Sequence, residues 1–479
     1  MTAALTRSPA APAGAAQSTV ASALPDLAQV RRAARIRRLL EGPIGPTLAR
    51  LAAPNVISMA VMSAMSIAEG YFAGLLGVSA LAGLALVFPL VMLTQMLSAG
   101  AMGGAISSAV ARALGAGDGA RAAGLTVAAW AIAIAAALTT ALLMGAFGRD
   151  VFTLLGGGDD AIAAALAYAG VFFPGCVALW LCHSSLSIVR GSGDMLTPSL
   201  VLLAVSLASI PLSGALALGW GPFPALGVAG LSAGPIIAYG AGALVAVAYI
   251  AIGRAGVSLA GALRRVERAL FADILKVGLV ASLNAVQTVL TIVVMVGLVG
   301  RHGTDALAGY GLGTRLEFLM VPVVFGIGSA MTAMVGANIG AGARERALKI
   351  AWTGAAAAAA IVGAIGVTMA ISPDLWLRIF LDADAAGPLQ AGRAYFRTVG
   401  PFYAFFALGL ALYFASQGAG RMGWPIVASL CRMATAFGGA LLLTTVGGFG
   451  VDGVFVAVAA GMFLYGTITV LAIRATRWR

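Results

Sequence analysis

The chain has 479 residues, of which 61% are hydrophobic and 10% are charged, and its mean hydropathy is +1.00. Because soluble globular proteins carry about 25% charged residues, this composition excludes a soluble enzyme or binding domain and indicates that the lipid bilayer is the solvent. The net charge of +12 falls in short connections between apolar stretches rather than in one patch, so we expect no nucleic-acid partner.

The first 43 residues are predicted to form a disordered basic tail. Residues 1–30 are rich in Ala, Pro and Ser and lack the apolar core of a signal peptide. The arginine-rich run from Arg31 to Arg38 predicts a short basic helix that lies at the membrane surface.

Twelve apolar stretches follow, each long enough to cross a bilayer, which requires about 20 residues. They begin near residues 48, 79, 122, 161, 196, 226, 270, 305, 347, 390, 423 and 451. We therefore predict an all-α integral membrane protein with twelve transmembrane helices. A cytoplasmic linker at residues 253–268 separates an N-lobe of six helices (44–252) from a C-lobe of six helices (269–479).

Arginine and lysine are distributed unevenly between the two sets of connections. One set, which includes both chain ends, holds most of them: Arg112 and Arg121; Arg190; Arg254, Arg264, Arg265, Arg268 and Lys276; Arg344, Arg346 and Lys349; and Arg421. The other set holds Arg149, Arg301, Arg378, Arg393 and Arg397. Because cytoplasmic connections carry the excess of Lys and Arg, we expect a multi-pass protein of the inner (plasma) membrane with both termini in the cytoplasm.

The two halves repeat the same short motifs at a nearly constant offset of 223 to 227 residues. Ala80-Leu81-Ala82-Gly83 matches Ala306-Leu307-Ala308-Gly309, Gly115-Ala116-Gly117 matches Gly340-Ala341-Gly342, and Gly191-x-Gly193-x-Met195-x-x-Pro198 matches Gly418-x-Gly420-x-Met422-x-x-Pro425. With six spans each, the two bundles share one orientation and are related by a pseudo-two-fold axis along the membrane normal. Two such bundles enclose a cleft that can open to either side, which favours a carrier over a receptor or a channel.

Two acidic residues, Glu69 and Glu317, are predicted to lie deep within spans, where a charge needs a cavity or a partner. Glu69 belongs to a stripe with spacings of three and four, which places its members on one helix face: Asn55, Ser58, Met62, Met65, Glu69 and Phe72. We interpret this face as a cavity wall and Glu69 as the ion-coupling residue, because a carboxylate can bind a proton or Na⁺ and release it when access switches. The alternative is a carboxylate that is hydrogen-bonded to a neighbouring helix.

The other polar residues within spans allow two interpretations. Some either line a substrate cavity or form hydrogen bonds between helices, namely Gln95, Asn284 and Gln287. Glu317 either has an ion or substrate role or forms a structural ion pair with Arg432, whereas Arg315 points to another face of the same helix. No metal site is certain. Without a Gly-x-x-x-x-Gly-Lys-Ser/Thr loop, neither ATP nor a cofactor is expected, and the chain is not predicted to be an enzyme.

Several motifs together resemble the multidrug and toxin extrusion (MATE) family and point to its bacterial DinF-like branch. The stretches that carry the resemblance are Leu51-Ala52-Ala53-Pro54, Glu69-Gly70-Tyr71-Phe72-Ala73-Gly74, Val110 to Asp118, Arg190-Gly191-Ser192-Gly193-Asp194 and Gly311 to Glu317. The resemblance covers about residues 44 to 475. It implies a secondary antiporter that exports small organic compounds, often cationic and drug-like, in exchange for H⁺ or Na⁺.

The resemblance places Glu69 where the first helix of the family carries its coupling Asp. In the fifth span, Ser206 and Ser209 stand where the family often has Asn and Asp, which weakens a Na⁺ site and makes H⁺ the expected ion. The superfamily also includes flippases of lipids and lipid-linked sugars. This alternative needs a large basic cavity, and only Arg315 and Arg432 lie deep in spans. The expected partners are a small-molecule substrate and the lipid bilayer, and a monomer is expected.

Overall fold

The computed structural model describes residues 27–478 apart from 260, 263–265 and 383, and within this part the regular structure is entirely helical. Twelve of the described helices are long and apolar enough to cross a membrane. Each begins within four residues of the start predicted from the sequence, so the prediction of a twelve-span helical membrane protein is confirmed. Helices form because every backbone N–H and C=O in hydrocarbon must be satisfied within its own segment.

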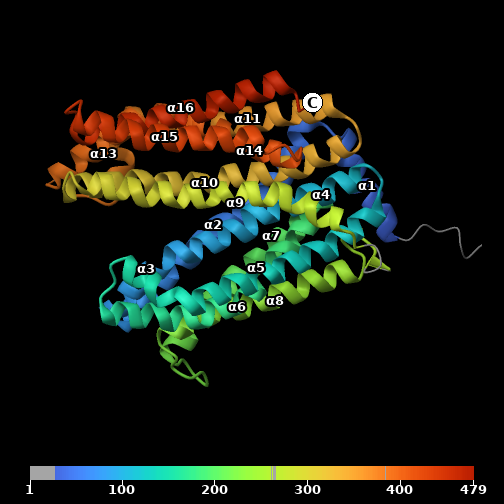
Figure 1. The fold of residues 1–479 in the computed structure, drawn as a ribbon, viewed down its shortest axis with the longest axis horizontal. Coiled ribbons are helices and arrows are strands. Elements are labelled where there is room, and N and C mark those ends of the chain that lie inside the picture. Colours follow the sequence, from blue (N-terminus) through green and yellow to red (C-terminus); the bar gives the residue numbers. More distant parts are fainter. Residues whose placement is uncertain (1–26, 260, 263–265, 383, 479) are drawn as a thin grey trace, which may run out of the picture.

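The helices divide into two bundles (Figure 1). The N-lobe consists of α2 (Ile44–Leu76), α3 (Val78–Gln95) continued by the π-helix η1 (Met96–Met102) and α4 (Gly103–Gly115), α5 (Gly119–Leu154), α6 (Asp159–Gly191), α7 (Leu196–Leu218) and α8 (Val228–Ala251). The C-lobe consists of α9 (Arg268–Gly300), α10 (Thr304–Gly340), α11 (Arg344–Ile371), the short α12 (Asp374–Leu377), α13 (Ala386–Val399) continued by η3 (Gly400–Phe402) and α14 (Tyr403–Gly418), α15 (Gly423–Thr445) and α16 (Gly450–Thr476).

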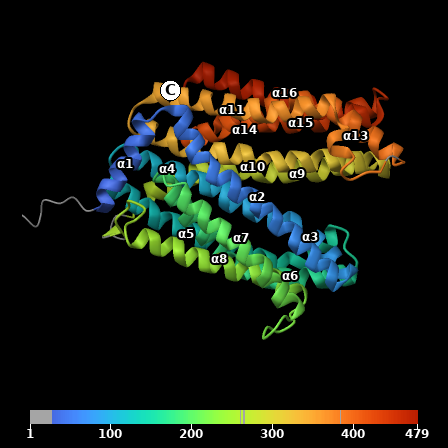
Figure 2. The same ribbon diagram turned by 180° about the vertical axis from the view of Figure 1, so that it is seen from behind.

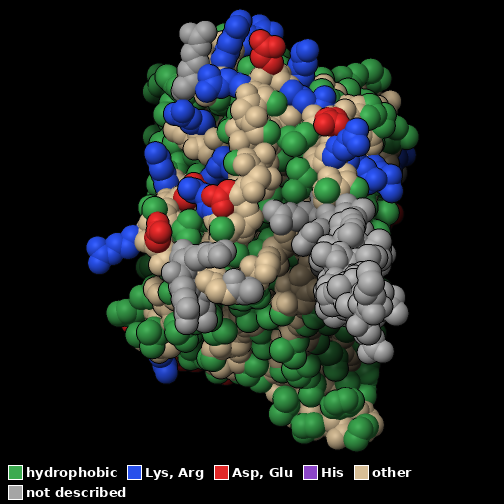
Figure 3. Space-filling model, turned by 90° about the vertical axis from the view of Figure 1, so that its right-hand side faces the viewer, with side chains coloured by type: hydrophobic (Ala, Val, Ile, Leu, Met, Phe, Trp, Pro, Cys, Tyr) green, Lys and Arg blue, Asp and Glu red, His purple; other side chains and the backbone are tan. Residues whose placement is uncertain are grey.

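Both views show the two bundles close together at one end of the molecule and apart at the other (Figures 1 and 2). We call the first the basic end and the second the open end. The basic end carries α1, the turns between α4 and α5 and between α10 and α11, and the last residues of α16. Figure 3 looks onto this end, where Lys and Arg side chains gather. The alternating course of the spans brings to it the connections that are richest in basic residues.

Helix α1 (Leu27–Glu41) precedes the first span. Residues 1–26 of the predicted disordered tail lie outside the described residues, whereas α1 contains the short basic helix predicted from Arg31 to Arg38 and extends beyond it at both ends. This helix is anchored to the N-lobe. Arg35 forms an ion pair of 3.2 Å with Asp194, which lies in the turn between α6 and α7.

The first helix of each lobe crosses to the other lobe at the basic end. Leu48 and Leu51, near the start of α2, belong to the hydrophobic core of the C-lobe, whereas Phe72 near its end belongs to the core of the N-lobe. In α9, Ile274 packs in the core of the N-lobe and Met295 in that of the C-lobe. This reciprocal exchange is the pseudo-two-fold relation predicted from the repeat, and it holds the lobes together at one end only.

Candidate functional site

A cavity of about 660 Å³ lies between the two lobes, in the half of the molecule nearer the open end. We call it the cleft. Its wall comes from α2, α3, α6 and α8 of the N-lobe and from α10 and the α12 region of the C-lobe. Seven aromatic residues of the described part line the cleft: Phe88, Tyr168, Phe172, Tyr239, Phe318, Trp376 and Phe380. Sites for drug-sized ligands have this size and share an apolar lining with few polar groups.

Glu69 faces the cleft from the second half of α2. Met65, one turn earlier on the same face, lines it as well. Glu69 is 9% exposed, and its Oε1 has no hydrogen-bond partner among the described residues. A neighbouring helix therefore does not satisfy this oxygen, contrary to the alternative considered from the sequence. Because a buried anion without a partner is unfavourable, a bound cation at Glu69 is favoured.

Gln95 of α3 and Arg315 of α10 also line the cleft. The guanidinium carbon of Arg315 lies 5.9 Å from the ring centroid of Phe380, which is within cation–π range. Arg315 was predicted as a structural charge, but the structure places it at the cleft wall. The described wall thus carries one anionic residue on the N-lobe, Glu69, and one cationic residue on the C-lobe, so a solute with charge of either sign finds a complementary group.

Helix α12 supplies part of the aromatic wall on the C-lobe. The indole Nε1 of Trp376 donates a hydrogen bond to the carbonyl oxygen of Leu312 at 2.9 Å. Arg393 donates two hydrogen bonds to Asp374 at 2.7 and 2.8 Å. These bonds, reinforced by Arg378, lower the pKa of Asp374 to about 2. The ion pair therefore persists across the physiological pH range and holds α12, with Trp376, against the cleft.

The stripe predicted on the first span is divided between two places. Met65 and Glu69 face the cleft, whereas Asn55 and Ser58 are buried at the basic end. Met62, between them, packs against the core of the N-lobe. One helix face runs past both places, because Asn55 and Glu69 are about 21 Å apart at 1.5 Å per residue. Only Met65 and Glu69 of the predicted stripe therefore reach the cleft.

Four other predicted candidates do not line the cleft. Ser209 donates a hydrogen bond of 2.7 Å to the backbone of its own helix, and Ser206 is buried beside it. The side-chain amide of Gln287 donates to Thr291 at 3.2 Å, one turn further along α9. Asn284 is half-buried on the same helix. The hydrogen bond of Gln287 therefore stays within its own helix. Among the described residues, none of these four candidates forms a hydrogen bond with a residue that lines the cleft.

A second cavity, of about 140 Å³, lies within the C-lobe and contains Glu317. The hydroxyl of Tyr395 donates a hydrogen bond to Glu317 Oε1. Arg432 lines the same cavity, but the described residues show no ion pair between it and Glu317. Its guanidinium carbon lies 5.7 Å from the ring of Phe406 and 5.5 Å from that of Tyr465. Opposite charges thus share one cavity without a direct ion pair, and the guanidinium packs against these rings.

Polar contacts between the lobes close the basic end. Asp273 of α9 accepts hydrogen bonds from Arg112 of α4 at 2.7 Å and from Arg121 of α5 at 2.9 Å. Asn55 of α2 donates one to Ser329 of α10 at 2.9 Å. We call these five residues the gate. Sequence reasoning missed Asp273; its only signal was an acidic residue at the start of the seventh span, and its partner Arg112 is 161 residues away.

The profile of the MatE family matches residues 54–214 and 280–441, which is more than half of the chain. The chain belongs to the MatE family. The two matched segments fall one on each lobe, as the internal repeat requires. Members of this family are transporters, so this MATE protein is a membrane transporter and not an enzyme.

The FAD transporter of Shewanella oneidensis is 24% identical to this MATE protein over 324 residues, which cover 64% of this chain and 68% of the relative. A MOP superfamily transporter from Pyrococcus furiosus, described by the reverse polarity of its binding pocket, has a TM-score of 0.84 at 23% identity over 92% of this chain and 97% of its own. An outward-facing multidrug resistance MATE transporter has a TM-score of 0.83 at 22% identity, with the same coverage. At these identities the structural similarity establishes a shared fold.

Proposed function

We propose that this MATE transporter is a secondary antiporter that exports small aromatic organic compounds in exchange for protons. The observation that carries the proposal is the place of Glu69, a buried carboxylate with an unpartnered oxygen in the wall of a cleft between the two lobes. One carboxylate can hold a proton or attract a substrate, and binding of one weakens binding of the other. This competition at a site that faces alternate sides of the membrane couples the two fluxes.

The orientation follows from the basic end. Cytoplasmic connections carry the excess of Lys and Arg, so we place the basic end and both termini in the cytoplasm of a cell whose inner (plasma) membrane the chain spans. The open end then faces outward, and the cleft with Glu69 lies in the half of the molecule on the outer side of the membrane.

The transport cycle then has two movements. A substrate enters from the cytoplasm when the gate is open, and the lobes rock about the crossing of α2 and α9 until the gate closes and the open end separates. A proton from outside binds Glu69 and weakens its attraction for the substrate, which leaves. The protonated carrier returns to the inward-facing state and releases its proton there.

Protons are preferred to Na⁺ on chemical grounds. A sodium ion needs several oxygen ligands around it, whereas a proton needs only one carboxylate oxygen. Ser206 and Ser209, the residues of the fifth span closest to such a role, are buried in helix packing. The described residues contain no group of three or more His, Cys, Asp or Glu side chains that could surround a metal ion.

The lining of the cleft favours flat aromatic substrates, which can stack on its rings. Glu69 suits the cationic, drug-like compounds that the family resemblance implies, and Arg315 suits a substrate with an anionic group. The relative from Shewanella oneidensis is named an FAD transporter, which makes flavin-like aromatic anions a second candidate class. A lipid-linked sugar flippase is less favoured, because binding a pyrophosphate requires several cationic side chains. The described lining of the cleft has one cationic residue, Arg315, and its anionic residue Glu69 would repel a pyrophosphate.

Dye efflux from proteoliposomes, with H⁺ and Na⁺ gradients imposed separately, tests this function. An inward H⁺ gradient should drive efflux by the native protein, and Glu69→Gln should abolish the response. Glu345→Gln, an exposed carboxylate at the basic end, is the matched control and should behave as the native protein. If neither gradient drives efflux and Glu69→Gln changes nothing, the antiporter proposal fails and lipid transport becomes the leading function.

A further inference from the structure

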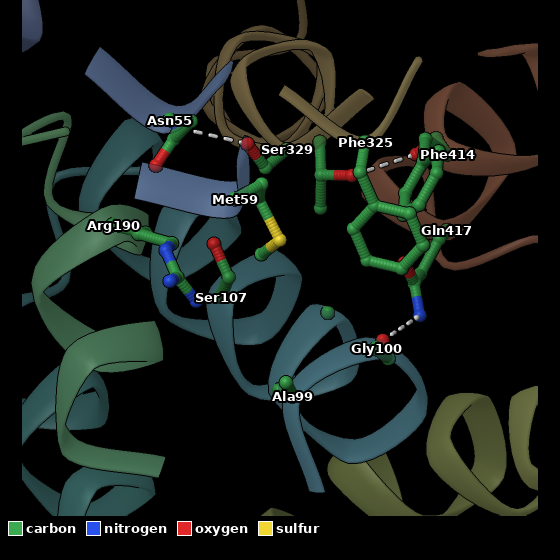
Figure 4. A pocket seen from close by; sticks show the side chains of 13 residues that line it. Asn55, Met59, Ala99, Gly100, Ser107, Arg190, Phe325, Ser329, Phe414 and Gln417 are labelled. Carbon is green, nitrogen blue, oxygen red and sulfur yellow. Dashed lines mark hydrogen bonds between the residues drawn. The ribbon is translucent and has the colours of Figure 1, made fainter. Parts of the chain in front are cut away.

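A small cavity of about 30 Å³ lies between the lobes at the basic end, and the proposed cycle assigns it no role. We call it the gate cavity. Both lobes contribute to its lining, which includes Asn55, Ser107 and Arg190 of the N-lobe and Phe325, Ser329 and Gln417 of the C-lobe (Figure 4). Its size allows a few water molecules at most in this conformation. Any movement that separates the lobes at this end enlarges it.

Arg190 is the charged residue of this cavity. It was predicted to lie in a connection, yet it stands one residue before the end of α6 and is only 6% exposed. Figure 4 shows its guanidinium turned toward Ser107 inside the cavity. No ion pair or hydrogen bond satisfies this guanidinium among the described residues, and its Nε is buried without a partner. Asp194, four residues later, already pairs with Arg35 and Tyr249.

The remaining chemistry of the gate cavity is that of an anion site. Its described lining contains no acidic residue. The hydroxyl of Ser107 is also buried without a partner and can donate to an anion. The Gln417 amide nitrogen already donates to the carbonyl oxygens of Gly100 and Ala101 at 3.3 and 3.2 Å, and its Oε1 is an acceptor, so Gln417 offers no bond to an anion. A buried cation with no anion is unfavourable in an apolar surrounding. A phosphate or carboxylate bound by the planar fork of Arg190 and the Ser107 hydroxyl removes this penalty.

The internal repeat provides a comparison within the same chain. Arg190 and Gln417 occupy equivalent positions, each directly before the repeated Gly-x-Gly motif. In the C-lobe an uncharged amide fills this position and bridges the lobes. Packing at this position therefore does not require a charge. The positive charge of Arg190 in the N-lobe is better explained by an anionic ligand.

We propose that Arg190 is an anion-binding residue that captures the phosphate or carboxylate group of an organic substrate when the gate is open to the cytoplasm. This inference rests on the proposed function, because only an inward-facing state exposes the gate cavity. It narrows the substrate class to compounds that combine an aromatic body, for the wall of the cleft, with an anionic group. Arg190 binds the anionic group of the substrate at the cytoplasmic access route, before the substrate reaches the cleft.

Flavin mononucleotide and riboflavin are matched probes, because they share one ring system and differ by a phosphate. Their initial uptake into inside-out vesicles, whose basic end faces the medium, is measured for the native protein, Arg190→Gln and Arg190→Lys. Arg190→Gln, which introduces the residue of the equivalent position, should raise KM for flavin mononucleotide at least about tenfold. KM for riboflavin should change less than about twofold. Arg190→Lys should lie between, because it keeps the charge and loses the fork.

Two controls keep the result specific. Arg421→Gln, an exposed arginine at the same end, should leave both KM values unchanged. The solubilised Arg190→Gln protein should melt at the native temperature or above it, because an unpaired buried cation has been removed. A lower melting temperature together with equal changes for both flavins would assign Arg190 a structural role and overturn the proposal, as would an unchanged KM for flavin mononucleotide.

The source of the anion is tested with vesicles that contain or lack phosphatidylglycerol. If Arg190→Gln changes transport only in vesicles that contain phosphatidylglycerol, and equally for both flavins, Arg190 binds a lipid headgroup. That result would overturn the proposal that its ligand is the anionic group of a solute. Equilibrium binding of both flavins to the purified proteins separates this inference from the proposed function. If no gradient drives transport but Arg190→Gln still weakens binding of flavin mononucleotide selectively, the antiporter proposal fails and the anion site stands.

Discussion

Gly115 at the end of α4 and Gly340 at the end of α10 occupy equivalent positions in the two repeats, and each packs against the backbone of the other lobe. A Cβ atom on Gly115 would collide with the carbonyl oxygen of Ala337, and one on Gly340 with the carbonyl oxygen of Arg112. The helix ends approach this closely because neither residue has a side chain. This crossing between the ends of α4 and α10 lies at the closed basic end. A methyl group added to either glycine would therefore destabilise the closed state relative to the state in which the basic end is open.

Gly340→Ala should favour the inward-facing state. Overpacking of this kind costs about 1–3 kcal/mol, and the lobes can avoid it by separating at the basic end. Spin labels at positions 154 and 371, both highly exposed at the open end, should then report a shorter distance in a background without the three native cysteines. Gly311→Ala, on the same helix where an added Cβ meets no atom within 4 Å, should leave the distance unchanged. An unaltered distance in Gly340→Ala would contradict the assignment of this crossing to the gate.

Asp273→Asn should loosen the gate, because it removes the ion pairs to Arg112 and Arg121. All three groups are partly exposed, so we expect a loss of about 0.5–1 kcal/mol and a two- to fivefold population shift toward the inward-facing state. The same pair of spin labels measures this shift, and higher ionic strength should move the native protein in the same direction. Asp382→Asn, an exposed carboxylate at the open end, is the control. Insensitivity of the distance to both Asp273→Asn and salt would show that the ion pairs do not hold the gate.

Helix α1 should act as a strap across the closed basic end. Arg35 pairs with Asp194 of the N-lobe at 3.2 Å, and the amide of Asn338 in the C-lobe donates to the carbonyl oxygen of Leu39 at 3.0 Å. The Leu39 side chain is also buried in the core of the C-lobe. Arg35→Ala combined with Leu39→Ala, which removes the ion pair and this packing, should therefore increase the reactivity of a cysteine at position 329 toward a hydrophilic thiol reagent added from the basic end.

The control for this strap is Arg37→Ala on the same helix. Arg37 pairs with Glu41 at 2.8 Å on the exposed side of α1, and both side chains are mostly exposed. Such a surface pair contributes little, so thiol reactivity at position 329 should stay at the native level. Equal reactivity in the double variant and in Arg37→Ala would refute the strap.

Glu317 should not be required for coupling. Its carboxylate accepts a hydrogen bond from Tyr395 inside the C-lobe, so it does not stand at the boundary that changes access. Glu317→Gln should keep H⁺-driven dye efflux, while Tyr395→Phe should lower the free energy of unfolding by about 1 kcal/mol. Loss of H⁺-driven efflux in Glu317→Gln would instead make this cavity a second ion site.

The pH profile of efflux should not depend on Asp374. Hydrogen bonds from Arg393 lower the pKa of Asp374 to about 2, below the ordinary value of about 3.9. A carboxylate with a lowered pKa stabilises the fold above about pH 4 and loses this contribution as the pH falls through about 2. Asp374→Asn should therefore leave the shape of the profile between about pH 5 and 8 unchanged, whereas Glu69→Gln should flatten it. A profile shifted by Asp374→Asn would show that α12 takes part in the proton response.

The sequence by itself determined the membrane architecture. Hydropathy is a local property of about 20 consecutive residues, so the starts of all twelve spans were predicted to within four residues. The repeated motifs predicted the pseudo-two-fold relation, because equivalent helix ends need equivalent residues. Glu69 could be singled out as a candidate from the sequence because a carboxylate within a span requires a cavity or a partner.

Only the tertiary structure decided which residues share a place. Periodicity assigns a side chain to a helix face but does not say what packs on that face. Asn55 and Glu69 lie on one face of α2, yet the first reaches the gate and the second the cleft, because α2 crosses from one lobe to the other. Arg190 was counted among the connections and is buried between the lobes. Asp273 acquires its role from an arginine 161 residues earlier, a contact that exists only when two separate bundles meet.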